Sequence, residues 1–326
     1  MKKAIITGIT GQDGSYLAEW LLAEGYEVHG TVRRSSTLER SRLAHLYTDS
    51  TIYNRRLFLH YSDLDDPTTL RRVLFKVAPC EIYHLAGQSH VGLSFEIPET
   101  TCQFTAMGTL RLLEMLRDLP QTPRFFHATS SELFGRPVDA PQTERTPIAP
   151  VNPYGCAKAF ASQLVRVYRE TYGIFAVNGI LYNHESPRRG EGFVTRKICR
   201  AAAAIKVGQQ DKLRLGDTTA KRDWGHARDY VRGMWLALQH HTADDYIFAT
   251  GQLHSVQNVL EEAFQALDLD WHDYVETDPQ MLRLAEPMHL VGDATKARTE
   301  LGWAPVTSFT DLIREMTLAE LQALKR

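Results

Sequence analysis

Short apolar runs alternate with amphipathic stretches through the first half of the chain. The runs have a length typical of buried parallel strands and lie at 3–7, 27–32, 57–61, 81–86, 124–129 and 175–182. Apolar residues at helical spacing follow Gly14 and recur near 67–77, 99–118 and 153–172. Strands that alternate with helices predict an α/β fold built on a Rossmann-type doubly wound parallel sheet.

The pattern changes after about residue 180. The stretch 183–197 is polar and basic, contains proline and glycine, and predicts a loop. Helices are expected near 194–207 and 225–240, with two or three more in 254–326. We therefore expect residues 1–180 to form the sheet domain, with about 225–252 returning to it. Residues 181–326 are expected to form mainly a smaller C-terminal lobe.

Composition narrows the classes of partner. The 326 residues carry a net charge of −2, so no strong field favours nucleic acid or an anionic membrane. No apolar run approaches the roughly 20 residues that a membrane-spanning helix needs. The four cysteines are scattered, and the histidines show no metal-binding spacing, so we expect no metal and a reduced, cytoplasmic protein.

A glycine triplet follows the first strand directly. Gly8, Gly11 and Gly14 precede a helix, which is the context in which glycine lets the backbone approach a dinucleotide pyrophosphate. The free N–H groups of the helix N-terminus would then face the anion. An ordinary tight turn is the alternative interpretation.

The end of the second strand indicates which cofactor is bound. Enzymes that use NAD place Asp or Glu there, whereas this chain has Arg33, Arg34, Ser35 and Ser36, which suit the 2′-phosphate of NADP. A solvated basic loop is the alternative. The expected cofactor-binding residues are Gly8, Gly11, Gln12, Asp13, Gly14, Arg33, Arg34, Ser35, Asp63, Leu64, Leu85, Gln88, Tyr154 and Lys158.

Four residues form the predicted catalytic group. Tyr154 and Lys158 are spaced by four on a predicted helix, so the ammonium would lie near the phenol, lower its pKa and help it act as a base. The strand ending at RFFHATSSE offers the hydroxyl of Ser130 to a substrate hydroxyl. Glu132 can remove a carbon-bound proton, as elimination of water requires. A strand-end or capping role is the alternative for Glu132.

The chain resembles the GDP-mannose 4,6-dehydratases, which are extended short-chain dehydrogenases. The matching segments span nearly the whole sequence: TGITGQDGSYLAEWLL, SSELFG, NPYGCAK, YNHESPRRG, FVTRKI, LRLGD and KRDWG. The resemblance implies a Rossmann domain that binds NADP and a smaller lobe that binds a sugar nucleotide. It also implies a homodimer or homotetramer, because the RRSS loop lies at a subunit contact in this family.

The resemblance further implies redox-neutral chemistry. Tyr154 would take the proton of the C4 hydroxyl while hydride passes from C4 to NADP, and Glu132 would take the C5 proton as water leaves C6. The hydride would then return to C6 and give a 4-keto-6-deoxy sugar. The implied contacts with the GDP-sugar are Ser89, Ser131, Asn183, Val194, Lys197, Arg222, Arg283 and Glu286.

Departures from the family pattern leave the exact sugar open. Ser130 replaces the usual threonine, Gly87 replaces an alanine, and the segments 136–150 and 283–287 differ. GDP-heptose is therefore an alternative substrate. An epimerase or 4-keto-reductase on the same scaffold is a second alternative, and a regulatory NADP-binding protein without activity is a third. Glu132 argues against the second, and Tyr154 with Lys158 argues against the third.

Overall fold

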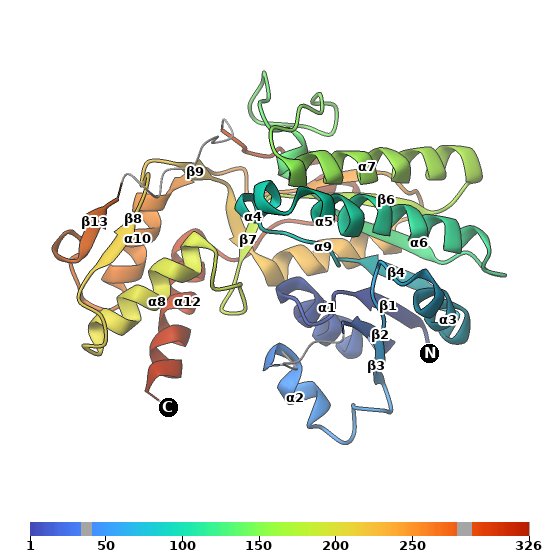
Figure 1. The fold of residues 1–326 in the computed structure, drawn as a ribbon, viewed down its shortest axis with the longest axis horizontal. Coiled ribbons are helices and arrows are strands. Elements are labelled where there is room, and N and C mark those ends of the chain that lie inside the picture. Colours follow the sequence, from blue (N-terminus) through green and yellow to red (C-terminus); the bar gives the residue numbers. More distant parts are fainter. Residues whose placement is uncertain (34–40, 279–288, 326) are drawn as a thin grey trace.

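The computed structural model describes residues 1–33, 41–278 and 289–325 (Figure 1). At its centre is a sheet of seven parallel strands in the order β11-β6-β5-β4-β1-β2-β3. These strands are β1 (Lys3–Thr7), β2 (Glu27–Val32), β3 (Leu57–Tyr61), β4 (Glu81–His84), β5 (Arg124–Ser130), β6 (Ala176–Leu181) and β11 (Asp245–Phe248). The chain winds outward from β1 in both directions, which confirms the predicted doubly wound sheet.

Helices cover both faces of this sheet (Figure 1). One face carries α1 (Gln12–Ala23), α9 (Ala227–Gln239) and α11 (Thr295–Leu301), and the other carries α3 (Pro67–Val77), α6 (Gly108–Arg117) and α7 (Pro153–Tyr172). Side chains of β1 alternate between the two layers: Ile6 packs with Leu17, whereas Ile5 packs with Leu74. Because both faces are covered, β1 and β6 are buried along almost their whole length.

The register brings three strand ends level. Thr7 of β1 is paired with Thr31 of β2 on one side and with His84 of β4 on the other. His84 is paired in turn with His127 of β5. The segments that follow these strands therefore leave the sheet along one edge.

A second apolar cluster lies beside that edge, at the left of Figure 1. It is built around α8 (Val194–Lys206), α10 (Val256–Gln265) and α12 (Phe309–Leu324), with β8 (Leu213–Leu215) paired to β13 (Val275–Thr277). Two residue pairs join β9 (Lys221–Arg222) to β12 (His254–Ser255). The remaining short elements are α2 (Ala44–Tyr47), α4 (Val91–Glu96) and the 3₁₀ turns Ser41–Leu43, Ser131–Leu133 and Trp271–Asp273.

Several elements differ from the prediction, and three of them bear on the sheet or the cleft. The single helix expected near 99–118 consists of α5 (Pro98–Cys102), a π-helical turn (Gln103–Met107) and α6. The expected loop at 183–197 begins with β7 (Asn183–Glu185), which pairs with β10 (Trp224–His226). Strand β11 was not predicted, because its four residues become a strand only by pairing with β6.

Asp223 lies between β9 and β10 and links them to the segment that follows β11. Its buried carboxylate accepts hydrogen bonds from the Thr250 and Gly251 N–H groups, at 2.8 and 2.9 Å, and from the Thr250 hydroxyl at 2.6 Å. Burial raises the pKa of Asp223, and these donors oppose the rise.

Within the described residues, no helix is long and apolar enough to cross a membrane.

Candidate active site

A cleft of about 560 Å³ opens where the strand ends meet. It lies at the point where the strand order reverses between β1 and β4, the place at which open α/β sheets bind ligands. Most of the predicted site residues line it: Gly8, Gly11, Gln12, Asp13, Gly14, Arg33, Asp63, Leu64, Leu85, Gln88, Ser89, Ser130, Ser131, Glu132, Tyr154, Lys158 and Asn183.

The glycine turn brings backbone segments into close contact. A Cβ atom on Gly14 would lie 2.3 Å from the Gly8 carbonyl oxygen, and one on Gly8 would lie 3.0 Å from the Ala86 backbone. Gly8 also has a φ of +75°, a conformation that favours glycine. The N-terminus of α1 therefore sits directly on the end of β1 with its free N–H groups available to an anion.

Three buried polar atoms in the cleft fit a ligand with many polar groups. Gln88 Oε1, Ser62 Oγ and Thr129 Oγ1 have no hydrogen-bond partner among the described residues. Buried polar groups are normally hydrogen-bonded, so orphans gathered at one site indicate a missing partner. Together with the glycine turn, they fit a dinucleotide such as the expected cofactor.

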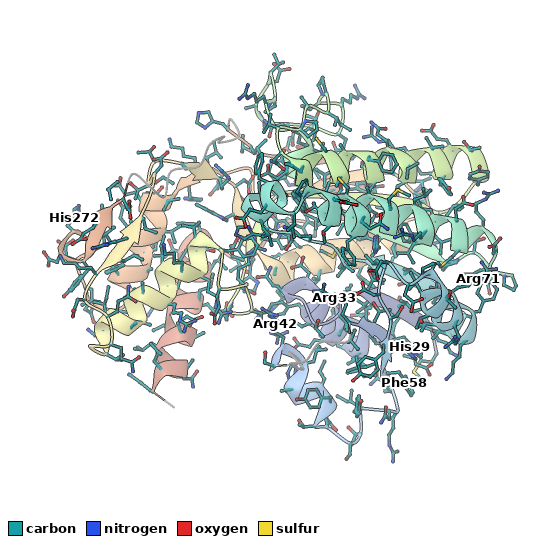
Figure 2. The ribbon with its side chains drawn as sticks, viewed as in Figure 1. His29, Arg33, Arg42, Phe58, Arg71 and His272 are labelled. Carbon is teal, nitrogen blue, oxygen red and sulfur yellow. The ribbon has the colours of Figure 1, made fainter. Side chains whose placement is uncertain are left out.

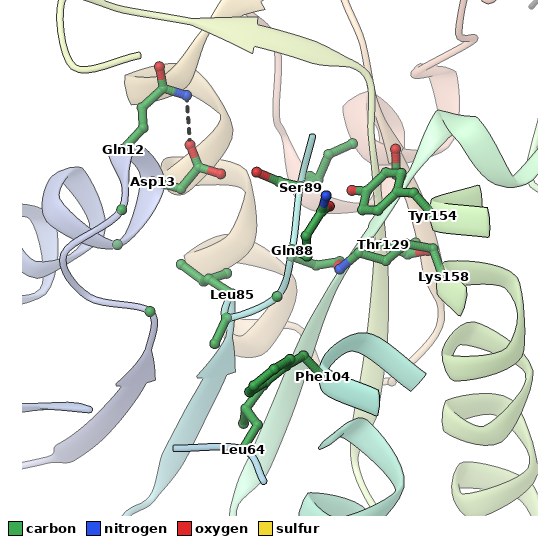
Figure 3. Close-up of a pocket in the computed structure, with 18 of the residues that line it drawn as sticks. Gln12, Asp13, Leu64, Leu85, Gln88, Ser89, Phe104, Thr129, Tyr154 and Lys158 are labelled. Carbon is green, nitrogen blue, oxygen red and sulfur yellow. Dashed lines mark hydrogen bonds between the residues drawn. The ribbon is translucent and has the colours of Figure 1, made fainter. Parts of the chain in front are cut away.

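Tyr154 and Lys158 lie on the α7 side of the cleft, across from Gln12 and Asp13 on α1 (Figure 3). The Lys158 Nζ donates to the Ala128 carbonyl at 2.6 Å and lies 5.9 Å from the centre of the Tyr154 ring. Burial lowers the pKa of the Lys158 ammonium to about 8. The lysine thus remains mostly charged at neutral pH while it is fixed by the end of β5.

The expected lowering of the Tyr154 pKa is not found in this structure. Burial raises the pKa of Tyr154 to about 12, although a hydrogen bond with Ser130 and the charge of Arg189 act in the opposite direction. The phenol is 8% exposed, and removing an anion from water costs more than a cation several ångströms away returns. Periodicity alone predicted the position of the lysine but not the burial of the phenol.

Ser130 and Glu132 reach the cleft from the end of β5. The Ser130 hydroxyl accepts from the Glu132 N–H at 3.3 Å and so caps the 3₁₀ turn Ser131–Leu133. The Glu132 carboxylate accepts a hydrogen bond of 2.8 Å from the side-chain amide of Asn152, the residue that caps α7. A hydroxyl, a carboxylate and a phenol therefore line one cleft.

A buried ion pair joins α1 to β7. His184 Nδ1 faces the Tyr182 carbonyl at 2.7 Å and Nε2 faces the Asp13 carboxylate at 2.8 Å. Because both ring nitrogens meet acceptors, both must carry protons, which makes the ring an imidazolium. Burial alone would lower the pKa of His184, but the Asp13 carboxylate outweighs it and the pKa is raised. The same pairing lowers the pKa of Asp13 against its own burial.

Arginines fasten the loop after β7 to the glycine turn. Arg42 donates to the Arg188 carbonyl at 2.7 Å and to the Thr10 carbonyl at 3.2 Å. Arg188 donates to Ser15 at 3.1 Å and pairs with Glu19 at 2.5 Å. In Figure 2, Arg33 and Arg42 lie close to α1.

Several residues that line the cleft were not predicted from the sequence to be site residues. Arg189 pairs with the buried Glu185 at 3.0 Å and stacks over the Phe193 ring at 3.6 Å, and burial still raises the pKa of Glu185. His184 and Phe104 also line the cleft. Arg189 belongs to the stretch 183–197, which was expected to be a polar loop, so its side chain was not predicted to line the cleft. No sequence signal marked Phe104, because a π-helical turn brings it there.

Three predicted residues lie outside the cleft, and four more belong to segments that the structure does not describe. Val194, Lys197 and Arg222 do not line this cleft; the Lys197 ammonium donates to the Arg214 carbonyl at 2.9 Å, on the side of the second apolar cluster. Arg34, Ser35, Arg283 and Glu286 lie outside the described residues. In the described part of the chain, no group of three or more His, Cys, Asp or Glu could hold a metal ion.

The Asp13–His184 pair predicts a measurable protonation state. In the wild-type protein at pH 7, ¹⁵N spectra of the imidazoles should show His184 protonated on both nitrogens. In Asp13→Asn the largest influence that opposes burial is lost, and the ring should be neutral at that pH. His184→Gln identifies the resonance. A neutral ring in the wild type would contradict the assignment.

The lowered pKa of Asp13 and the raised pKa of His184 determine the pH range in which this pair stabilises the folded protein. The pair contributes fully between pH 3.8 and pH 6.5, the ordinary pKa values of its members. Its contribution is lost as the pH rises through the raised pKa of His184 or falls through the lowered pKa of Asp13. The wild type should therefore exceed Asp13→Asn in stability most clearly inside that window.

The chain is similar over nearly its whole length to GDP-mannose 4,6-dehydratases. A family profile described as GDP-mannose 4,6 dehydratase matches residues 5–316. GDP-mannose 4,6 dehydratase 2 of Arabidopsis thaliana is 52% identical, with 100% of this chain and 88% of the relative covered. The GDP-mannose 4,6-dehydratase of Sinorhizobium fredii is 49% identical over 99% of this chain and 98% of its own length. The human enzyme is 46% identical over 99% and 92%.

Solved structures show the same fold. The dTDP-glucose 4,6-dehydratase DesIV of Streptomyces venezuelae, with NAD and TYD bound, gives a TM-score of 0.86 at 26% identity, covering 98% of this chain and 97% of that one. RMD from Pseudomonas aeruginosa, complexed with NADPH, gives 0.82 at 24% identity over 99% and 100%. With a profile match from residue 5 to residue 316, this chain belongs to the GDP-mannose 4,6-dehydratase family and is a hydro-lyase.

Proposed function

We propose that the protein converts GDP-mannose into GDP-4-keto-6-deoxymannose, with NADP as its resident cofactor. The observation that carries the proposal is the convergence of Ser130, Glu132 and Tyr154 on the cleft that the glycine turn closes. The relatives' names supply the substrate. A homodimer or homotetramer and a cytoplasmic location stay predictions.

Arg33 supports the choice of NADP. It follows β2 directly and lines the cleft, at the position where an enzyme specific for NAD carries a carboxylate. A guanidinium can bind a 2′-phosphate with two parallel hydrogen bonds. Related structures hold either NADPH or NAD, so the proposal rests on this residue and on its neighbours Arg34 and Ser35 in the sequence.

Bound NADP would accept a hydride from C4 of the hexose and return it to C6. The task of Tyr154 is to take the proton of the C4 hydroxyl, with Ser130 as its hydrogen-bond partner. Lys158, fixed by the Ala128 carbonyl, places a positive charge beside the phenol. This charge favours the phenolate, whose formation burial opposes.

Glu132 then removes the C5 proton that the new C4 ketone has acidified. The C6 hydroxyl leaves as water with the proton that Glu132 has taken, and once hydride has returned to C6 the proton held by Tyr154 passes to C5, so there is no net oxidation. The sugar loses one water, and the cofactor ends as it began. Asn183, Ser89 and Ser131 line the cleft where the sugar and its first phosphate would lie. Val194, Lys197, Arg222, Arg283 and Glu286 are proposed to hold the rest of the GDP group.

The first experiment replaces the proposed base. Wild-type protein incubated with GDP-mannose and no added reductant should form the 4-keto product. Glu132→Gln should lower kcat by about 10²- to 10⁴-fold, the usual contribution of a general base. The first hydride transfer should survive, so reduced cofactor should accumulate in the variant up to one per site.

Glu170→Gln is the matched control, because it neutralises an exposed carboxylate on α7. Full turnover by Glu132→Gln would favour an epimerase or 4-keto-reductase instead. Product from GDP-heptose but none from GDP-mannose would change only the proposed substrate.

The cofactor proposal has its own test. Arg33→Ala should weaken NADP binding by about tenfold or more and leave NAD binding unchanged, because one charge-assisted hydrogen-bonding group is lost. Titration calorimetry measures both affinities. Arg55→Ala removes an exposed arginine that does not line the cleft and should change neither. Equal weakening of both cofactors would contradict the assignment to the 2′-phosphate.

A further inference from the structure

Asn152 connects Glu132, the proposed base, to α7, the helix that carries Tyr154. Its side-chain Oδ1 accepts the Gly155 N–H at 2.7 Å and caps α7, and its Nδ2 donates to Glu132 Oε2 at 2.8 Å. The residue is 6% exposed. One side chain therefore makes two hydrogen bonds of opposite sense in a place that water scarcely reaches.

The direction of both bonds is fixed by chemistry. A backbone N–H can only donate, so the atom facing Gly155 must be the carbonyl oxygen of the amide. The nitrogen is then left facing the carboxylate, to which it can only donate. The hydrogen bond therefore holds one oxygen of the carboxylate that would accept the carbon-bound proton.

The backbone at Gly155 packs closely against the backbone at Glu132, which restricts movement of Asn152 relative to Glu132. A Cβ on Gly155 would lie 2.6 Å from the Glu132 carbonyl oxygen and 3.3 Å from Asn152 Oδ1. Pro153 occupies the first helical position, where its fixed φ suits a helix start. Tyr154 is the next residue of α7, so the Glu132 carboxylate and the Tyr154 phenol are both positioned by the start of this helix.

We propose that Asn152 is a positioning residue that orients the Glu132 carboxylate for removal of the C5 proton. The proposal rests on the proposed function, in which Glu132 is the base. Asp, Ser and Thr cap helices about as well as Asn. Of these, only Asn also presents an amide N–H to the carboxylate, so helix capping alone does not explain the residue.

The test uses two variants that keep the cap. In Asn152→Asp, a carboxylate replaces the donor and faces Glu132, and like charges this close favour protonation of one of them. The acid limb of the kcat–pH profile should move up by roughly one pH unit or more, with activity recovered at higher pH. In Asn152→Ser the shorter hydroxyl caps the helix without reaching the carboxylate, and kcat should fall about tenfold, the effect of losing one hydrogen bond to a charge.

Both variants should keep the KM for GDP-mannose within about twofold and unfold near the wild-type temperature, since the cap survives. Ser308→Ala is the control, because Ser308 caps α12 within the second apolar cluster. It should lower the unfolding temperature and leave the pH profile unmoved. Among the described residues, the titratable and charged groups that also line the cleft, and that must be unaltered for this comparison, are Asp13, Arg33, Asp63, Tyr154, Lys158, His184 and Arg189.

The outcomes separate the two proposals. A wild-type profile in Asn152→Asp, with Glu132→Gln inactive, would show that Asn152 is only a cap and would overturn this inference alone. Full turnover by Glu132→Gln would remove the base and overturn both. If Asn152→Asp fails to fold, an unchanged kcat in folded Asn152→Ser overturns the inference, and a selective fall in kcat supports it.

Discussion

The parallel pairing of β1 with both β2 and β4 is the constraint on which the site depends. It places the strand ends level and makes the chain leave the sheet in opposite directions from the point where β1 and β4 meet. A cleft must open there, because no crossover helix covers the gap. The residues that follow β1, β2, β4, β5 and β6 then converge although they are far apart in sequence. The close approach of α1 to β1 at Gly14 lets the helix N-terminus form one wall of this cleft.

Ion pairs and one charge-assisted hydrogen bond hold side chains that line this cleft. The imidazolium of His184 is held by Asp13, Arg189 by Glu185 and Phe193, and Glu132 by Asn152. The His184–Asp13 and Glu132–Asn152 contacts each join two segments that no strand pairing connects, whereas Arg189 and Glu185 lie on one segment. Interactions of this kind cost desolvation, so their value lies in fixing the geometry of reacting groups more than in overall stability. A base that must reach a carbon-bound proton beside a buried phenol requires such fixed geometry.

Local sequence features predicted much of this arrangement. The bounds of α3 and α7 follow from periodicity and from the prolines that begin them, and the glycine turn follows from its place between a strand and a helix. Tertiary contacts decided the rest. Strands β7 and β11 exist only through their partners, and a π-helical turn brings Phe104 to the cleft. The burial that raises the pKa of Tyr154 is equally invisible in a YxxxK spacing. The division near residue 180 and the roles of Arg283 and Glu286 stay predictions, and those two residues lie outside the described ones.

The central claim is that one cleft carries out oxidation, elimination and reduction on the same sugar without releasing reducing equivalents. Isotope transfer tests it most directly. GDP-mannose labelled with deuterium at C4 should yield a 4-keto-6-deoxy product that carries the deuterium at C6 of the same molecule. A mixture of labelled and unlabelled substrate should give no crossover. Deuterium recovered in free reduced cofactor, or a product without deuterium at C6, would contradict the account.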